Sequence, residues 1–229
     1  MNKVFSVLKL YFRETVSKLI MILLLMTLSE LTLYFMTATE MRSFAGLVEK
    51  CRIFYIYVIA FAAMTLFNSI RSSRKHKTGY TLQRIRISER AAFLLQFVAD
   101  TVNVLIVYLW QIVIILILYR LYKQHGYQSA ADIYQDFYIS NTLTMLIPLY
   151  RKQQWVTNAV ILLSAGAEAA SIDVKVRYGQ YVHLGIIALW PSVLDIHDPY
   201  LHYFFLRFIL VVIDFCWAYQ LTHNGKGRQ

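Results

Sequence analysis

Six stretches of this 229-residue chain are predominantly apolar, and the more polar segments between them hold most of the charged residues. The apolar stretches are 19–38, 53–70, 91–119, 156–172, 181–194 and 201–221. A membrane-spanning helix needs about 20 such residues, because the hydrocarbon layer of a bilayer is about 30 Å thick. The sequence therefore predicts an all-α polytopic membrane protein with six transmembrane helices.

The composition leaves too little polar surface for a soluble protein of this size. Hydrophobic residues make up 58% of the chain and charged residues only 16%, whereas soluble domains contain about 45–50% apolar residues. Six spans would use about 120 residues, which excludes a large soluble domain attached to one anchor. Because the sequence contains no internal repeat and no linker, we expect a single transmembrane domain over residues 1–229.

Two segments depart from this simple pattern. Segment 181–194 is short and contains a proline, so it is expected to form a kinked or re-entrant pair rather than one straight helix. Segment 139–150 is apolar but has only about a dozen residues, including Pro148, which makes it a poor span. We expect it to lie at the outer membrane surface within an extracytoplasmic loop, 120–155. A crossing at 139–150 would instead shift the later topology.

The distribution of basic residues indicates an orientation. The formal net charge is +10, and with the N-terminus in the cytoplasm fifteen of the 23 Lys and Arg residues fall inside, among them Lys175 after the fourth span. Seven fall outside and Arg207 lies in the sixth span. The positive-inside rule favours this arrangement, which predicts a multi-pass plasma-membrane protein with both termini cytoplasmic. Basic residues spread over several membrane-flanking segments argue against a nucleic-acid partner.

The first 18 residues have the pattern of an amphipathic helix. Apolar side chains recur at helical spacing, with basic and polar residues offset from them: Val4, Phe5, Leu8, Tyr11 and Phe12. Such a helix binds in the plane of a lipid surface. We expect residues 1–18 to form a surface helix on the cytoplasmic leaflet, in contact with membrane lipid, before the first span.

The predicted cytoplasmic loop 71–90, with the sequence RSSRKHKTGYTLQRIRISER, is unusual for an anchoring segment. Its charge alone fits ordinary positive-inside anchoring. However, apolar Tyr80, Leu82, Ile85 and Ile87 interrupt the charges, and anchoring does not require them. A short helix that presents apolar and basic side chains would fit a groove on a soluble partner.

This arrangement resembles the permease subunits of ABC-2-type exporters, in which a surface helix precedes six spans and a coupling helix lies between the second and third spans. The run 78–88, TGYTLQRIRIS, is similar to the coupling helix of that family. The stretch 143–149 followed by Trp155, and the run 175–179, are similar to small Firmicutes permeases that export amphipathic peptides. The resemblance therefore indicates a bacterial transporter.

The resemblance also implies a division of labour. A separate P-loop ATPase subunit would bind ATP and Mg²⁺ and would drive the permease through the coupling helix, and the permease would pair with a second copy or a paralogue. The cargo would be a hydrophobic or amphipathic peptide. The residues expected to contact the ATPase are Tyr80, Leu82, Arg84, Ile85, Arg86, Ile87 and Glu89.

Two acidic residues lie well inside predicted spans, where a carboxylate is costly. Glu30 is near the middle of the first span and Asp214 is in the sixth. One interpretation is that both are paired or hydrated within the helix bundle; the other is that both face a cavity and favour cationic or amphipathic cargo. Small residues also recur in the fourth span, around Gly166, and such spacing lets helices pack closely within one subunit or across a dimer interface.

The sequence lacks the motifs of common catalytic sites. It contains no GxxxxGK[ST], HExxH or CxxC pattern, so we expect no metal site, no nucleotide and no cofactor bound by this chain, and its two cysteines do not imply a disulfide framework. Two alternatives to a transporter remain open. One is an intramembrane enzyme that uses Glu30, Asp214 and a histidine on lipid or peptide; the other is a non-transporting membrane sensor or immunity protein.

Overall fold

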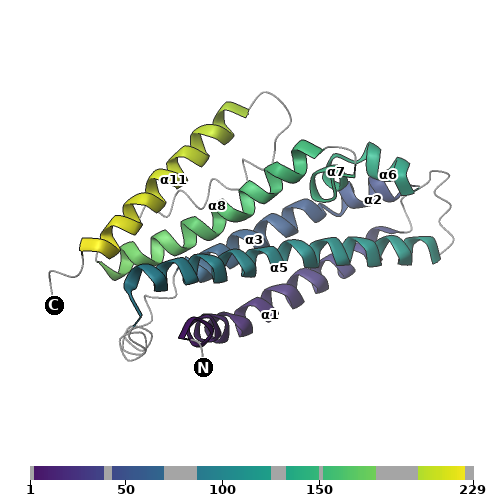
Figure 1. The fold of residues 1–229 in the computed structure, drawn as a ribbon. Coiled ribbons are helices and arrows are strands. Elements are labelled where there is room, and N and C mark those ends of the chain that lie inside the picture. Colours follow the sequence, from purple (N-terminus) through teal and green to yellow (C-terminus); the bar gives the residue numbers. More distant parts are fainter. Residues whose placement is uncertain are drawn as a thin grey trace. The chain divides into compact units, whose positions relative to one another are not determined.

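The computed structural model describes residues 3–38, 43–69, 87–124, 133–149, 152–178 and 201–224, and in these residues every regular element is a helix (Figure 1). The helices are α1 (Lys3–Thr37), α2 (Phe44–Lys50), α3 (Ile53–Ser69), α5 (Glu89–Gln124), α6 (Ile133–Ile139), α7 (Asn141–Leu146), α8 (Lys152–Arg177) and α11 (Leu201–Asn224). The predicted all-α class is therefore confirmed for the described part of the chain.

Two of these helices, α1 and α5, are long and apolar enough to cross a membrane, and α2 with α3 forms a third span if the pair, bent by 50°, counts as one. Helices of this length and apolar composition indicate a membrane protein. Of the six predicted spans, two or three are thus supported within the described residues. Helix α8 is not among these candidates, the fully described apolar part of α11 is shorter, and segment 181–194 lies outside the described residues.

Helix α1 runs without a break through both the predicted surface helix and the predicted first span. Its threonines do not interrupt it, because their hydroxyl groups donate to the carbonyl oxygen one turn earlier. Thr27 Oγ1 donates to Leu23 O at 2.7 Å, and Thr37 Oγ1 donates to Leu33 O at 2.7 Å. A hydroxyl bonded in this way needs no water, so it is tolerated in an apolar helix.

The chain divides into two compact units, which are described separately. Unit 1 comprises Met1–Leu19, Ala62–Val104 and Ile161–Gln229, and unit 2 comprises Ile20–Phe61 and Leu105–Val160. Helices α1, α3, α5 and α8 therefore each contribute a segment to both units.

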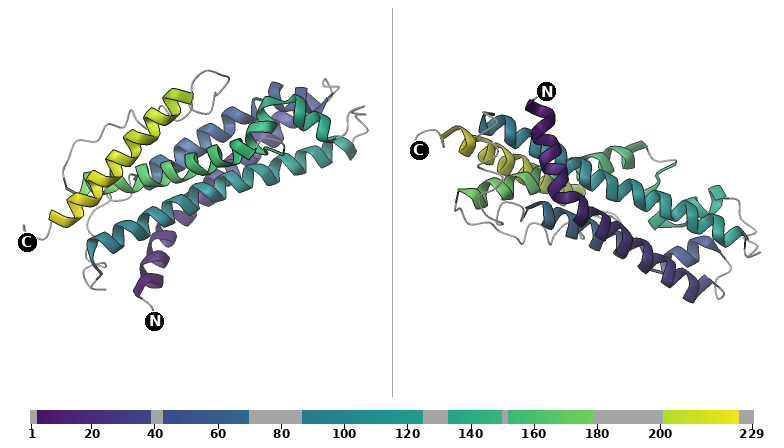
Figure 2. Two further views of the ribbon diagram at one scale, coloured as in Figure 1. Left: turned by 45° about the horizontal axis from the view of Figure 1, so that its top comes forward. Right: turned by 90° about the horizontal axis from the view of Figure 1, so that it is seen from below.

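In unit 1 the second half of α8 packs against α5 and α11 (Figures 1 and 2). The two helices α5 and α8 approach very closely at Gly166, because a Cβ atom built there would lie 2.0 Å from Thr101 Oγ1 and 2.9 Å from Thr101 Cα. Between α5 and α11, the rings of Phe93 and Phe215 have centroids 4.8 Å apart. The small-residue spacing around Gly166 thus serves packing within the chain, one of its two predicted roles.

In unit 2 the short helices α2, α6 and α7 pack against one another (Figure 1). Two of them begin at serine caps, since Ser43 Oγ accepts from Gly46 N and Ser140 Oγ accepts from Leu143 N. Phe44 of α2 packs on Tyr119 of α5, with ring centroids 5.1 Å apart. Segment 139–150 forms no spanning helix among its described residues, as expected, because it divides between the end of α6 and the short helix α7.

Candidate functional site

The described chain resumes within the predicted coupling loop, at Ile87, and α5 begins two residues later. Ser88 caps this helix, with its Oγ accepting from Ala91 N at 3.3 Å. The acidic Glu89 occupies the first turn, where a negative charge is favoured by the helix dipole. The serine that ends the predicted coupling motif is therefore the N-cap of α5.

Three interactions tie this start of α5 to other helices of unit 1. Ile87 packs against a buried cluster formed by α1 and α5, which includes Val7 and Tyr11. Glu89 Oε2 accepts a hydrogen bond from the hydroxyl of Tyr178, at the end of α8. The Arg90 guanidinium lies over the Tyr219 ring of α11, 5.4 Å from its centroid. The end of the loop is thus fixed to α1, α8 and α11, and we call Ile87–Arg90 with these partners the loop junction.

Of the seven residues predicted to contact an ATPase, the structure describes Ile87 and Glu89, both in the loop junction. The other five lie outside the described residues: Tyr80, Leu82, Arg84, Ile85 and Arg86. The loop junction is therefore the described part of the predicted coupling loop.

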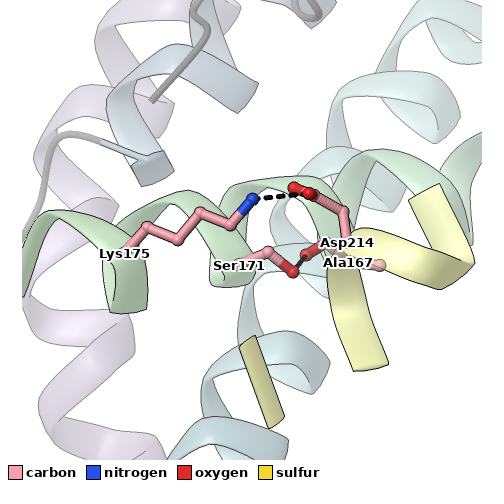
Figure 3. Close-up of polar contacts among 4 residues, drawn as sticks. All are labelled: Ala167, Ser171, Lys175 and Asp214. Carbon is pink, nitrogen blue, oxygen red and sulfur yellow. Dashed lines mark hydrogen bonds and ion pairs between the residues drawn. The ribbon is translucent and has the colours of Figure 1, made fainter. Parts of the chain in front are cut away.

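Asp214 of α11 forms an ion pair with Lys175 of α8, with Lys175 Nζ 2.5 Å from Asp214 Oδ1 (Figure 3). The Lys175 side chain is only 8% exposed and that of Asp214 is 24% exposed. The same ammonium group lies 4.9 Å from the centroid of the Trp217 ring, also on α11, which adds a cation–π interaction. The pair joins α8 to α11 inside unit 1.

Ser171, one turn before Lys175, does not share in this pair (Figure 3). Its Oγ donates to the carbonyl oxygen of Ala167 at 2.7 Å. The described hydrogen bond of Ser171 stays within α8, whereas the contacts of Lys175 join α8 to α11.

The helix that carries Lys175 is longer than the sequence predicts. The fourth span was expected to end at Ile172, but α8 continues to Arg177 and buries Lys175. Polar residues do not end a helix whose backbone hydrogen bonds continue, so the apolar run underestimates the length of α8.

Glu30 of α1 is fully buried in unit 2 and accepts a hydrogen bond at Oε2 from Gln111 Nε2 of α5, at 3.2 Å. One position earlier on α5, Trp110 Nε1 donates to Thr27 Oγ1 at 2.9 Å. Two side-chain hydrogen bonds therefore join the apolar stretches of α1 and α5. Bonds of this kind contribute about 0.6 kcal/mol each on average in membrane proteins.

Both acids singled out from the sequence thus have partners within the chain, in different units: Gln111 for Glu30 and Lys175 for Asp214. This fits the interpretation that they are paired within the helix bundle. Neither partner could be identified from spacing, because Lys175 and Asp214 are 39 residues apart and Glu30 and Gln111 are 81 apart.

Comparison with known proteins gives no further guide to the family. A scan with protein-family models, a search of curated proteins and a search of solved structures each found no match to this chain.

Proposed function

We propose that this chain is the transmembrane permease subunit of an ATP-driven exporter of the ABC-2 type, which moves hydrophobic or amphipathic peptides out of a bacterial cell. ATP and Mg²⁺ bind to a separate P-loop ATPase subunit, and the chain works with a second permease copy or a paralogue. It performs no hydrolysis itself. The apolar helices α1 and α5 are long enough to cross a membrane, which supports a function within the membrane.

The loop junction is the observation that carries the proposal. A loop that transmits force needs a stiff connection to the helices that move, since a flexible exit would absorb the displacement. Ile87, Glu89 and Arg90, which lie in the last four residues of the loop, contact α1, the end of α8 and α11. Movement of the loop by a bound ATPase would therefore displace α1, α5, α8 and α11 at one end of unit 1.

Cargo recognition by Glu30 and Asp214 is left out of this proposal, because each carboxyl group has a partner within the chain. The coupling surface consists of the apolar side chains of the loop and their basic neighbours. Its predicted residues are Tyr80, Leu82 and Ile85, with Arg84 and Arg86 as polar partners. Ile87 and Glu89, also predicted there from the sequence, bind within the chain and connect this surface to the helices.

The test replaces Leu82 and Ile85 together by aspartate in the full chain, coexpressed with the P-loop ATPase that co-purifies with it. Two buried carboxylates would oppose docking in an apolar groove, so we expect export to stop and ATP hydrolysis to lose its dependence on cargo. The matched control, Ser72→Asp with Ser73→Asp, adds the same charge to polar positions of the loop and should retain coupled export.

Wild-type export by the Leu82→Asp, Ile85→Asp double variant would exclude this loop as the coupling element. If no ATPase co-purifies with the wild-type chain after gentle extraction, the transporter function itself is wrong.

A further inference from the structure

The Glu30–Gln111 pair in unit 2 has more acceptor atoms than donors. Both residues are 0% exposed. Gln111 Nε2 donates to Glu30 Oε2, whereas Glu30 Oε1 and Gln111 Oε1 have no hydrogen-bond partner among the described residues. An unpaired buried polar atom costs about 1–3 kcal/mol, so two such atoms in one pair call for a physical explanation.

The charged groups around Glu30 also disfavour an ionised carboxylate. In the described part of the chain Glu30 forms no ion pair. Among the described residues, the Cys51 thiol interacts electrostatically with Glu30 and can only add negative charge, and the neighbouring Trp110–Thr27 hydrogen bond is neutral. An ionised Glu30 would therefore be a buried charge supported by one amide, at a cost of several kcal/mol.

We infer that Glu30 carries a proton in the folded chain and that the Glu30–Gln111 pair is a proton-binding site. A proton on Oε1 turns that atom from an acceptor into a donor and leaves Gln111 Oε1 as the matching acceptor. A carboxylic acid and a primary amide are both planar and each offers one donor beside one acceptor, so they can form two hydrogen bonds to each other. One proton thus neutralises the carboxylate and gives both unpaired oxygen atoms a hydrogen-bond partner.

This inference is independent of the proposed function, because it requires neither an ATPase nor a cargo. It assigns a specific role to the interface between α1 and α5. With the proton bound, the interface consists of neutral hydrogen bonds; without it, a carboxylate lies between two apolar helix segments. Release of the proton therefore requires water to reach the pair, which links the protonation of Glu30 to the separation of α1 from α5.

Infrared spectroscopy of the full chain in lipid nanodiscs tests the site directly. At neutral pH we expect a carbonyl-stretch band of a protonated carboxylic acid, lost in the isosteric variant Glu30→Gln. In Gln111→Leu the band should persist but move to higher frequency, because the acid loses its hydrogen-bond partner. Asp100→Asn and Glu168→Gln, which alter buried acids elsewhere, should leave the Glu30 band in place.

Isotope labelling makes the test independent of variant folding. In the wild-type chain, carbon-13 in glutamate carboxyl groups should shift the band and carbon-13 in aspartate should not. A wild-type spectrum with no acid band that responds to glutamate labelling overturns the proposal. A carboxylate band of Glu30 that responds to added sodium also overturns it, and would assign the pair to a metal cation instead.

Discussion

Lys175 and Asp214 differ in how far each is removed from solvent, and this sets the energetics of their ion pair. The lysine side chain is 8% exposed and the aspartate side chain is 24% exposed. Removing one partner leaves the other as an uncompensated charge, and the cost rises with the burial of the charge that remains. The interaction with Trp217 offsets part of this cost for the lysine, by about 0.5–2 kcal/mol.

We expect Asp214→Leu to destabilise the chain more than Lys175→Met does. Breaking a buried ion pair costs about 3–5 kcal/mol, and the loss for Asp214→Leu should lie toward the lower end of this range. The double variant should be more stable than Asp214→Leu alone, since no unpaired ion remains. Thermal unfolding in detergent, followed by circular dichroism, measures all three. If the losses of the two single variants simply add in the double variant, the ion pair does not form in the folded chain.

At the residue scale the sequence predicts which positions are unusual but not what they contact. Glu30 and Asp214 stand out because a carboxylate is costly inside an apolar run. Lys175 could not be matched to Asp214, because their pairing depends on α8 extending past its apolar run. Gln111 carries no charge and therefore gave no signal within the long apolar stretch of α5.

Helices α5 and α8 approach each other closely because Gly166 has no side chain. Thr101 of α5 fills the space that a Cβ atom would need, with its own Cα and Cβ atoms each 2.9 Å from that position. Relief would require a shift of the α5 backbone, since rotation of the threonine hydroxyl does not move the backbone carbon of Thr101. The stability of unit 1 should therefore respond strongly to one methyl group at this position.

We expect Gly166→Ala to destabilise the chain by about 1–3 kcal/mol, the usual cost of overpacking. This loss would appear although alanine is the better helix former by about 1 kcal/mol. Thermal unfolding in detergent measures the change. Leu163→Ala, on the same helix at a side chain 49% exposed, is the control and should change stability much less. An alanine variant as stable as the wild-type chain would show that the helices do not meet at Gly166.

At the element scale, apolar runs predict where helices exist better than where they end. Helix α3 begins at Ile53, as predicted, because Arg52 has a φ of 51°, a left-handed conformation that separates α3 from α2. Helix α8 extends four residues before and five beyond the predicted 156–172, and α1 joins two elements that we expected to be distinct. A bilayer limits the length of the apolar part, whereas helical hydrogen bonds can continue through polar residues on either side.

Across the whole molecule, segments assigned to the same side of the membrane meet within the same unit. Helix α2 and helices α6 and α7, all from predicted outer loops, pack together in unit 2. The start of α5 meets the end of α8 and the last part of α11 in unit 1, and all three were assigned to the cytoplasmic side. These neighbours agree with the predicted grouping of segments by membrane side, a grouping that is the same for either orientation.

Single-cysteine labelling tests the predicted orientation in a chain whose two natural cysteines are replaced by serine. We expect Ser129→Cys and Gln153→Cys to react with a membrane-impermeant maleimide in intact cells, and Ser73→Cys to react only after permeabilisation. Reaction of Ser129→Cys but not Gln153→Cys would mean that 139–150 crosses the membrane after all. Reaction of Ser73→Cys alone in intact cells would invert the whole topology.

The close approach at Gly166 also restricts where a transported molecule could pass. A space too small for a methyl group admits neither a peptide side chain nor a water molecule, so the α5–α8 seam of unit 1 is sealed at this level. Helices that touch at the backbone can open a path only by separating, whereas those held by long side chains can part gradually. In the proposed exporter, a path for cargo through unit 1 would therefore run along another face of α5 or α8 for as long as the two helices stay in contact at Gly166.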